Sequence, residues 1–149
     1  MKISNPLMRG FYAGLIAGCV GGMGVTIIRI LEVALSFPII VYPYFLEFDM
    51  IINHLGYSIS AHGIFGGIFG IIYLKFYNRI PSKGVKKGLI FGSIIFLIAN
   101  LTWASSNFIS WLFIGIEQSF IWAYEFLTAG FFIWIPYGIL LGVIYEKWK

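Results

Sequence analysis

Long apolar runs separated by short polar stretches dominate the pattern along this chain. Crossing about 30 Å of hydrocarbon takes roughly 20 apolar residues in a helix, because a backbone group left unpaired in lipid costs several kcal/mol. Four runs are long enough, at about residues 10–35, 58–77, 84–104 and 120–147. We therefore predict an all-α integral membrane four-helix bundle, with residues 1–149 forming a single transmembrane domain.

The two connections on the far side of this predicted bundle, residues 36–57 and 105–119, are apolar for loops. In the first, apolar side chains recur at helical spacing between Pro43, a helix-starting residue, and Gly56, a helix-stopping one. We expect that segment to lie flat at the outer interface. The second carries Trp111 and is expected to rest in the headgroup layer or on a partner.

Composition agrees with a bilayer as the solvent. The chain is 60% hydrophobic and 11% charged, whereas about a quarter of a soluble protein is charged. The basic residues do not alternate with exposed aromatic residues in any polar segment, so we expect no nucleic-acid partner. Cys19 is the only cysteine, which excludes an internal disulfide and a cysteine-based metal site within one chain.

Positive charge gathers on one side of the predicted bundle. The basic residues that flank the spans on the side of both termini are Lys2, Arg9, Lys75, Arg79, Lys83, Lys86, Lys87, Lys147 and Lys149. Only Arg29 lies elsewhere, and Glu146 is the one acidic residue on the basic side. Because cytoplasmic loops carry the excess of Lys and Arg, we predict a multi-pass cell-membrane protein with cytoplasmic N and C termini.

The first half of the chain resembles the second. Residues 10–18 align with residues 84–92 through three glycines and a shared Leu-Ile pair. Residues 66–75 align with residues 138–147 at nearly the same offset. We interpret the four spans as two parallel helical-hairpin repeats, of the kind related by an axis along the membrane normal.

Small residues spaced by four, the GxxxG pattern, occur in every predicted span. This spacing lets helix backbones approach closely, so that dispersion packing can hold helices together in lipid. The predicted helix-packing positions are Gly14, Gly18, Gly66, Gly70, Gly88, Gly92, Gly138 and Gly142. They favour either packing inside one bundle or a face for another subunit.

The order of these features resembles the YagU-like small membrane proteins, which are largely uncharacterised. The shared features are a glycine-striped first span, a histidine followed by glycines in the second, a basic turn, a glycine-striped third span and Tyr-Gly-x-x-x-Gly-x-x-Tyr in the last. Such proteins can also place a histidine ahead of the glycines of the fourth span, where this chain has Trp134 and Pro136. The resemblance therefore implies a fold and no particular activity.

A few polar residues fall at membrane depth, where an ionisable group is costly and marks a functional position by default. Counted at about 1.5 Å per residue from the cytoplasmic ends, His62 and Asn100 lie roughly 20 Å across, inside the hydrocarbon. Arg29 and Glu125 lie roughly 30 Å across, near the outer interface. With Glu32, these residues form the predicted polar cluster.

Each member of the polar cluster has a structural and a functional interpretation. Arg29 and Glu32 are three residues apart on one helix and can form an ion pair, or Arg29 can hold an anionic lipid headgroup or orient Glu125. His62 can serve as a proton relay or as a metal or haem ligand. The structural interpretation of His62 is a hydrogen bond across helices, to Asn100 or to a serine.

No recognised catalytic pattern accompanies these residues. The chain has no Gly-x-Ser-x-Gly, Walker loop or HExxH, so we expect no enzyme, no cofactor and no metal. The leading hypothesis is a non-enzymatic helix-packing or accessory subunit of a homo- or hetero-oligomeric membrane complex, with lipid and other membrane subunits or copies of itself as partners. The alternative is a small transporter or channel whose outer-facing cavity is lined by the polar cluster. A membrane enzyme acting on lipid or quinone is a third hypothesis.

Overall fold

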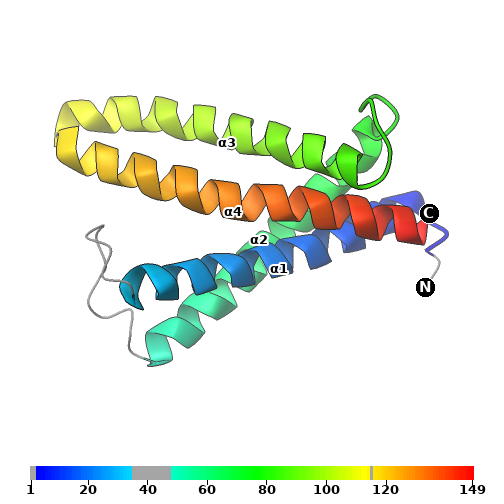
Figure 1. Cartoon of the computed structure of the whole chain (residues 1–149), viewed down its shortest axis with the longest axis horizontal. Helices are drawn as coiled ribbons and strands as arrows, with labels where there is room; N and C mark the ends of the chain where they lie inside the picture. Colours follow the sequence, from blue (N-terminus) through cyan, green and yellow to red (C-terminus); the bar gives the residue numbers. More distant parts are fainter. Residues whose placement is uncertain (1–2, 35–47, 115) are drawn as a thin grey trace.

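Four helices make up the computed structural model, which describes residues 3–34, 48–114 and 116–149 (Figure 1). They are α1 (Pro6–Ala34), α2 (Phe48–Phe76), α3 (Val85–Ile114) and α4 (Ile116–Trp148). Each contains a stretch that is long and apolar enough to cross a membrane. The predicted all-α fold with four helices suited to a multi-pass membrane protein is confirmed.

Local signals explain where two of the helices begin. The side chain of Asn5 accepts hydrogen bonds from the backbone N–H of Leu7, at 2.9 Å, and of Met8, at 3.3 Å. Such a cap, followed by proline at the first helical position, starts α1. Before α3, Gly84 has a φ of +53°, a left-handed conformation that glycine adopts without steric cost.

The helices are longer than the predicted spans. Residues 48–57, expected to lie flat at the interface, are the first turns of α2, and residues 105–114 continue α3. Helices of 29 to 33 residues measure about 45 Å, so their ends extend beyond about 30 Å of hydrocarbon with their backbone hydrogen bonds still made. Gly56 lies inside α2 because glycine is tolerated within membrane helices. Pro43 lies outside the described residues.

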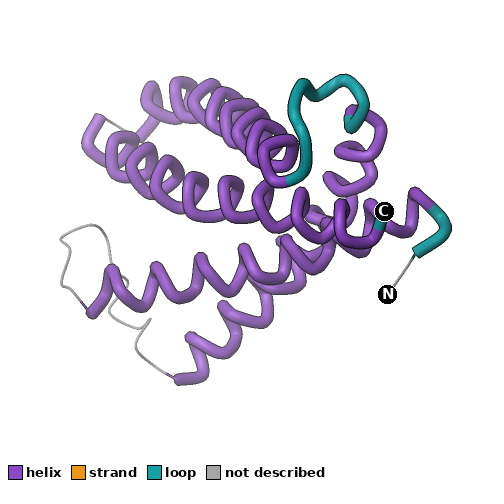
Figure 2. The backbone as a smooth tube through the Cα atoms, turned by 45° about the vertical axis from the view of Figure 1, so that its right-hand side comes forward, coloured by secondary structure: helices purple, strands orange, loops and turns teal. Residues whose placement is uncertain are grey.

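The helices form two antiparallel hairpins. Within the described ranges, α1 packs along α2, α3 packs along α4, and the hairpins meet mainly through α1 and α4. The packing order is therefore α2, α1, α4, α3. Figures 1 and 2 show the hairpins close together at the end that carries both chain termini and parted toward the opposite end.

Glycines form the contact between α1 and α2. A Cβ atom added to Gly14 would come closer than 3.0 Å to the backbone of Gly66 and Gly70. A Cβ atom on Gly18 would come equally close to the backbone of His62. Only glycine, which has no Cβ atom, lets the two backbones lie this close together.

The second hairpin has the same kind of contact. A Cβ atom on Gly88 would clash with the backbone of Gly138 and Gly142, and one on Gly92 would clash with the backbone of Trp134 and Gly138. The glycines that the sequence singles out thus face the other helix of their own hairpin. The face that they form is covered inside the bundle and is not free for another subunit.

Aromatic side chains join the hairpins near the end that carries the termini. Tyr73 of α2 is fully buried, and its ring centroid lies 5.6 Å from that of Tyr77, 5.1 Å from Phe91 of α3 and 5.5 Å from Tyr145 of α4. These distances suit edge-on and tilted aromatic packing. Tyr73 therefore connects three helices.

A hydrogen bond also joins the hairpins through the core. The hydroxyl of Tyr137 in α4, 1% exposed, donates to the carbonyl oxygen of Gly66 in α2 at 2.8 Å. We expect Tyr137→Phe to lower the free energy of unfolding in mild detergent by about 1 kcal/mol, within the range for hydrogen bonds between membrane helices. The loss stays modest because the Gly66 carbonyl keeps its partner within α2.

The matched control is Tyr73→Phe. Within the described residues the Tyr73 hydroxyl has no hydrogen-bond partner, so its removal is expected to change stability by less than about 0.5 kcal/mol. Equal losses in the two variants would show that the Tyr137 hydrogen bond does not stabilise the bundle.

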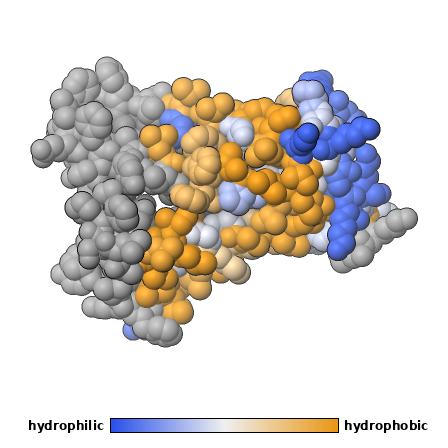
Figure 3. All heavy atoms as spheres, in the orientation of Figure 1, coloured by the Kyte–Doolittle hydropathy of each residue, from blue (hydrophilic) through white to orange (hydrophobic). Residues whose placement is uncertain are grey.

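The surface divides into an apolar band and a polar end. Figure 3 shows the apolar band across the middle of the molecule and hydrophilic residues gathered at the end of the two termini. Exposed apolar side chains in this band include Ile27, Ile64 and Leu97, each more than half exposed. Such a band is the surface that a bilayer requires of a spanning protein.

Candidate functional site

The structure describes the side chains of two members of the predicted polar cluster, His62 and Asn100, and each bonds within its own helix. Nδ1 of His62 lies 2.8 Å from the carbonyl oxygen of Ser58 in its own helix. Nδ2 of Asn100 donates to the carbonyl oxygen of Phe96, also in its own helix, at 2.7 Å. The expected hydrogen bond from His62 across helices is therefore replaced by a bond within α2, because the carbonyl four residues earlier is within reach of a side chain that folds back.

The other members of the cluster lie outside the described side chains. The backbones of Arg29 and Glu32 belong to α1 and that of Glu125 belongs to α4, but their side-chain positions are not described. The ion pair between Arg29 and Glu32 stays a prediction. Thr26, which is 2% exposed, donates to the Gly22 carbonyl oxygen at 3.3 Å.

Metal ligands do not converge in the described part of the chain. No group of three or more His, Cys, Asp or Glu residues there is placed to hold a metal ion. Cys19 Sγ lies 3.8 Å from the carbonyl oxygen of Ile59 on the neighbouring helix. The contact of Cys19 joins α1 to α2, whereas the hydrogen bond of His62 stays within α2.

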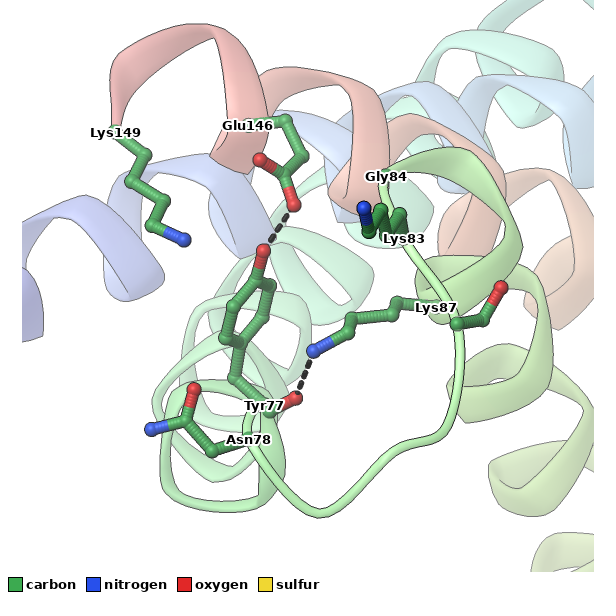
Figure 4. A pocket seen from close by; sticks show the side chains of 8 residues that line it. Tyr77, Asn78, Lys83, Gly84, Lys87, Glu146 and Lys149 are labelled. Carbon is green, nitrogen blue, oxygen red and sulfur yellow. Dashed lines mark hydrogen bonds between the residues drawn. The ribbon is translucent and has the colours of Figure 1, made fainter.

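The described polar residues converge instead at the end of the two termini. A hollow of about 530 Å³, here called the basic-end pocket, lies between the turn after α2, the start of α3 and the last turn of α4 (Figure 4). Its lining residues are Tyr77, Asn78, Ser82, Lys83, Gly84, Lys87, Glu146 and Lys149. Three lysines and one glutamate thus line one open hollow.

Tyr77 occupies the centre of this pocket. Its hydroxyl donates a hydrogen bond to the Glu146 carboxylate, and its backbone carbonyl accepts one from Nζ of Lys87. The ammonium groups of Lys87 and Lys149 lie 3.8 Å and 4.8 Å from the centroid of its ring, within range of a cation–π interaction. Figure 4 shows these lysines on different sides of Tyr77. One tyrosine therefore ties α3 and α4 to the end of α2.

Burial and the neighbouring Glu146 keep the hydroxyl of Tyr77 protonated. Burial, together with the hydrogen bond to Glu146 and the charge of that carboxylate, raises the pKa of Tyr77 to about 12. The phenol therefore stays protonated at neutral pH and remains the donor in its bond to Glu146. One oxygen of the Glu146 carboxylate therefore already accepts a hydrogen bond, from the Tyr77 hydroxyl.

Lys87 is unusual because it is 8% exposed although it is charged. We expect Lys87→Met to lower the free energy of unfolding by about 2 kcal/mol, since it removes a charged hydrogen bond and a cation–π contact and leaves the Tyr77 carbonyl without this donor. Thermal unfolding in mild detergent measures the loss.

Lys86→Met is the control for that variant. Lys86 is the exposed neighbour of Lys87 on α3 and carries the same charge. Its replacement is expected to change stability by less than about 0.5 kcal/mol. A loss shared by both variants would mean that total charge, and not the contacts of Lys87, stabilises this end.

Sequence reasoning missed this pocket. The lysines around the turn were explained by membrane orientation, and Tyr77 received no role. A usable signal was present, because Glu146 is the one acidic residue among the basic ones on that side and Tyr73, Tyr77 and Tyr145 also fall there.

No protein-family model, curated protein or solved structure matches this chain. The resemblance to YagU-like proteins stays a prediction from the sequence. Function is therefore inferred from the geometry alone.

Proposed function

We propose that this protein is a non-enzymatic helix-packing or accessory subunit of a homo- or hetero-oligomeric complex in the cell membrane, with both termini in the cytoplasm. The observation that carries the proposal is the open packing order α2, α1, α4, α3. In a closed four-helix bundle, α2 would also pack along α3. Here, within the described residues, α2 and α3 each have one extended partner, which leaves an apolar side on each for further helices.

The proposed orientation rests on the end of the molecule that carries the basic residues. Basic residues lie in or directly beside the last turns of the spans on the side of the termini: Arg9, Lys75, Arg79, Lys147 and the lysines of the basic-end pocket. Cytoplasmic ends of membrane helices carry such an excess. This supports a cytoplasmic position for both termini.

The repeat is supported by equivalent contacts. Gly14 meets Gly66 in the first hairpin, and Gly88 meets Gly138 in the second. Gly14 aligns with Gly88, and Gly66 aligns with Gly138. We infer two parallel hairpin repeats, each closed by the same glycine contact. This arrangement is compatible with the proposed likeness to YagU-like proteins.

The test is photo-cross-linking in the native membrane. In a Cys19→Ser background, a benzophenone maleimide is attached at Ile68→Cys on α2 or Leu97→Cys on α3, positions 47% and 56% exposed. We expect discrete protein adducts from both sites, identified by mass spectrometry as copies of this chain or as specific other subunits. The label at Ile16→Cys on α1, 41% exposed, is the control and should react with lipid. Lipid adducts alone at all three sites would contradict the proposal.

A second candidate is a small transporter or channel. The parting of the hairpins away from the basic end (Figure 2) favours it, since two bodies joined at one end can alternate between open and closed forms. Reconstitution of the purified protein in liposomes distinguishes the two candidates. Solute movement by the protein without any other subunit would favour the transporter.

A further inference from the structure

We propose that the basic-end pocket binds the phosphate group of an anionic ligand at the level of the lipid headgroups. The pocket is a separate feature from the open sides of α2 and α3, so the inference does not depend on the subunit role. Three lysines carry its chemistry. Membrane orientation requires basic residues at this end of the molecule, but it does not require them to line the same pocket.

The charge of the lining is positive. Lys83, Lys87 and Lys149 line the pocket together with a single acidic residue, Glu146. That carboxylate already accepts a hydrogen bond from the Tyr77 hydroxyl. The pocket therefore offers an excess of donors and positive charge, which a phosphate with its several acceptor oxygens satisfies.

Part of the site is held in place before any ligand arrives. Lys87 is buried, and its ammonium is fixed by the carbonyl and the ring of Tyr77. Lys83 and Lys149 are exposed and can turn toward a ligand. Because Lys87 is already fixed, binding loses less side-chain entropy than it would if all three lysines had to be ordered.

The start of α3 adds a second source of positive potential. Gly84, which lines the pocket, directly precedes the first residue of α3. The first amides of a helix lack intrahelical acceptors and favour anions. This contribution reinforces the lysines and does not define the site without them.

The position of the pocket relative to the membrane indicates that a lipid can supply the phosphate. The apolar stretch of α2 ends at Phe76, that of α3 begins at Val85 and that of α4 ends at Trp148, each next to a residue of the pocket. The pocket thus lies at the membrane–water boundary, where basic sites between membrane helices bind lipid phosphates. Its volume of about 530 Å³ is that of a small-molecule site. A soluble phosphate compound would offer the same chemistry from the aqueous side.

The test compares two double variants of the purified full chain in non-ionic detergent. Lys83→Gln/Lys149→Gln removes two charges from the pocket, whereas Lys86→Gln/Lys147→Gln removes two charges from the same end outside it. Native mass spectrometry and thermal shift measure binding of phosphatidylglycerol, of phosphatidylcholine and of inorganic phosphate. We expect the affinity for phosphatidylglycerol to fall about 30-fold in the first variant and less than about 3-fold in the second.

The probes separate the two sources of phosphate. Saturable binding of phosphatidylglycerol that millimolar inorganic phosphate does not displace identifies a lipid headgroup, and displacement identifies a free phosphate ligand. Equal losses in the two double variants would overturn the proposal, because diffuse charge would explain them. Binding of phosphatidylglycerol no tighter than phosphatidylcholine, without phosphate binding, would also overturn it.

A single variant distinguishes weaker binding from misfolding. Lys83→Gln keeps Lys87, Lys149 and their contacts with Tyr77. It is expected to weaken phosphatidylglycerol binding about 5-fold, with unchanged elution in size exclusion. An unchanged affinity in this folded variant would contradict the role of the pocket.

Discussion

A valine at position 14 is expected to hold α1 away from α2 and to lower the free energy of unfolding by about 3 kcal/mol. Even a single Cβ atom on Gly14, smaller than a valine side chain, would come closer than 3.0 Å to the backbone of Gly66 and Gly70. Backbone atoms in a helix cannot turn aside as the end of a side chain can. The helices must therefore separate, and the dispersion contacts between them are lost. Equilibrium unfolding in mixed micelles, followed by circular dichroism, measures the change.

Two further variants make that measurement specific. Gly24→Ala, on the same helix, meets no atom within 4 Å and is expected to stay within about 0.5 kcal/mol of the parent protein. Gly88→Val should lose as much as Gly14→Val, because Gly88 meets Gly138 and Gly142 in the same manner. If Gly14→Val were as stable as Gly24→Ala, the close glycine contact would not be what closes the hairpin.

Tyr73→Ala is expected to produce the other large loss, about 3 kcal/mol. Tyr73 is fully buried and packs on aromatic rings of α2, α3 and α4. Removing its ring leaves a cavity where the hairpins join, and the surrounding helices can fill it only in part. The free energy of unfolding in mixed micelles tests this expectation.

Tyr73→Phe shows whether the ring or the hydroxyl matters. The hydroxyl has no hydrogen-bond partner among the described residues, so phenylalanine is expected to match tyrosine within about 0.5 kcal/mol. A phenylalanine variant as unstable as the alanine variant would mean that the hydroxyl, and not ring packing, carries the stability.

Much of the fold follows from the sequence, but the residues at which the helices meet do not. Every predicted span has small residues at a spacing of four, so spacing alone permits several pairings. The structure pairs Gly14 with Gly66 and Gly88 with Gly138. That choice depends on the shapes of whole helix faces, which local spacing does not describe. Residues 48–57 and 105–114, which were predicted to rest at the interface, continue α2 and α3, because apolar interface segments and helix extensions have the same composition.

The candidate site was less predictable than the fold. His62 and Asn100 were singled out because polar groups in hydrocarbon are costly, yet each meets that cost with a carbonyl of its own helix. The pocket around Tyr77 was missed, since its bond to Glu146 joins residues 69 positions apart. The sequence marks Glu146 as the one acidic residue on the basic side, but it does not indicate that Tyr77 is its partner.

The sequence by itself determined the number of helices suited to a membrane and the end at which basic charge collects. Both follow from rules that act on short segments, because lipid requires every span to satisfy its own backbone and basic residues remain beside the spans that they flank. Only the tertiary structure decided the packing order, the aromatic junction at Tyr73 and the basic-end pocket. These depend on side chains from distant segments fitting together, and complementary shape and charge arise only when the helices have packed.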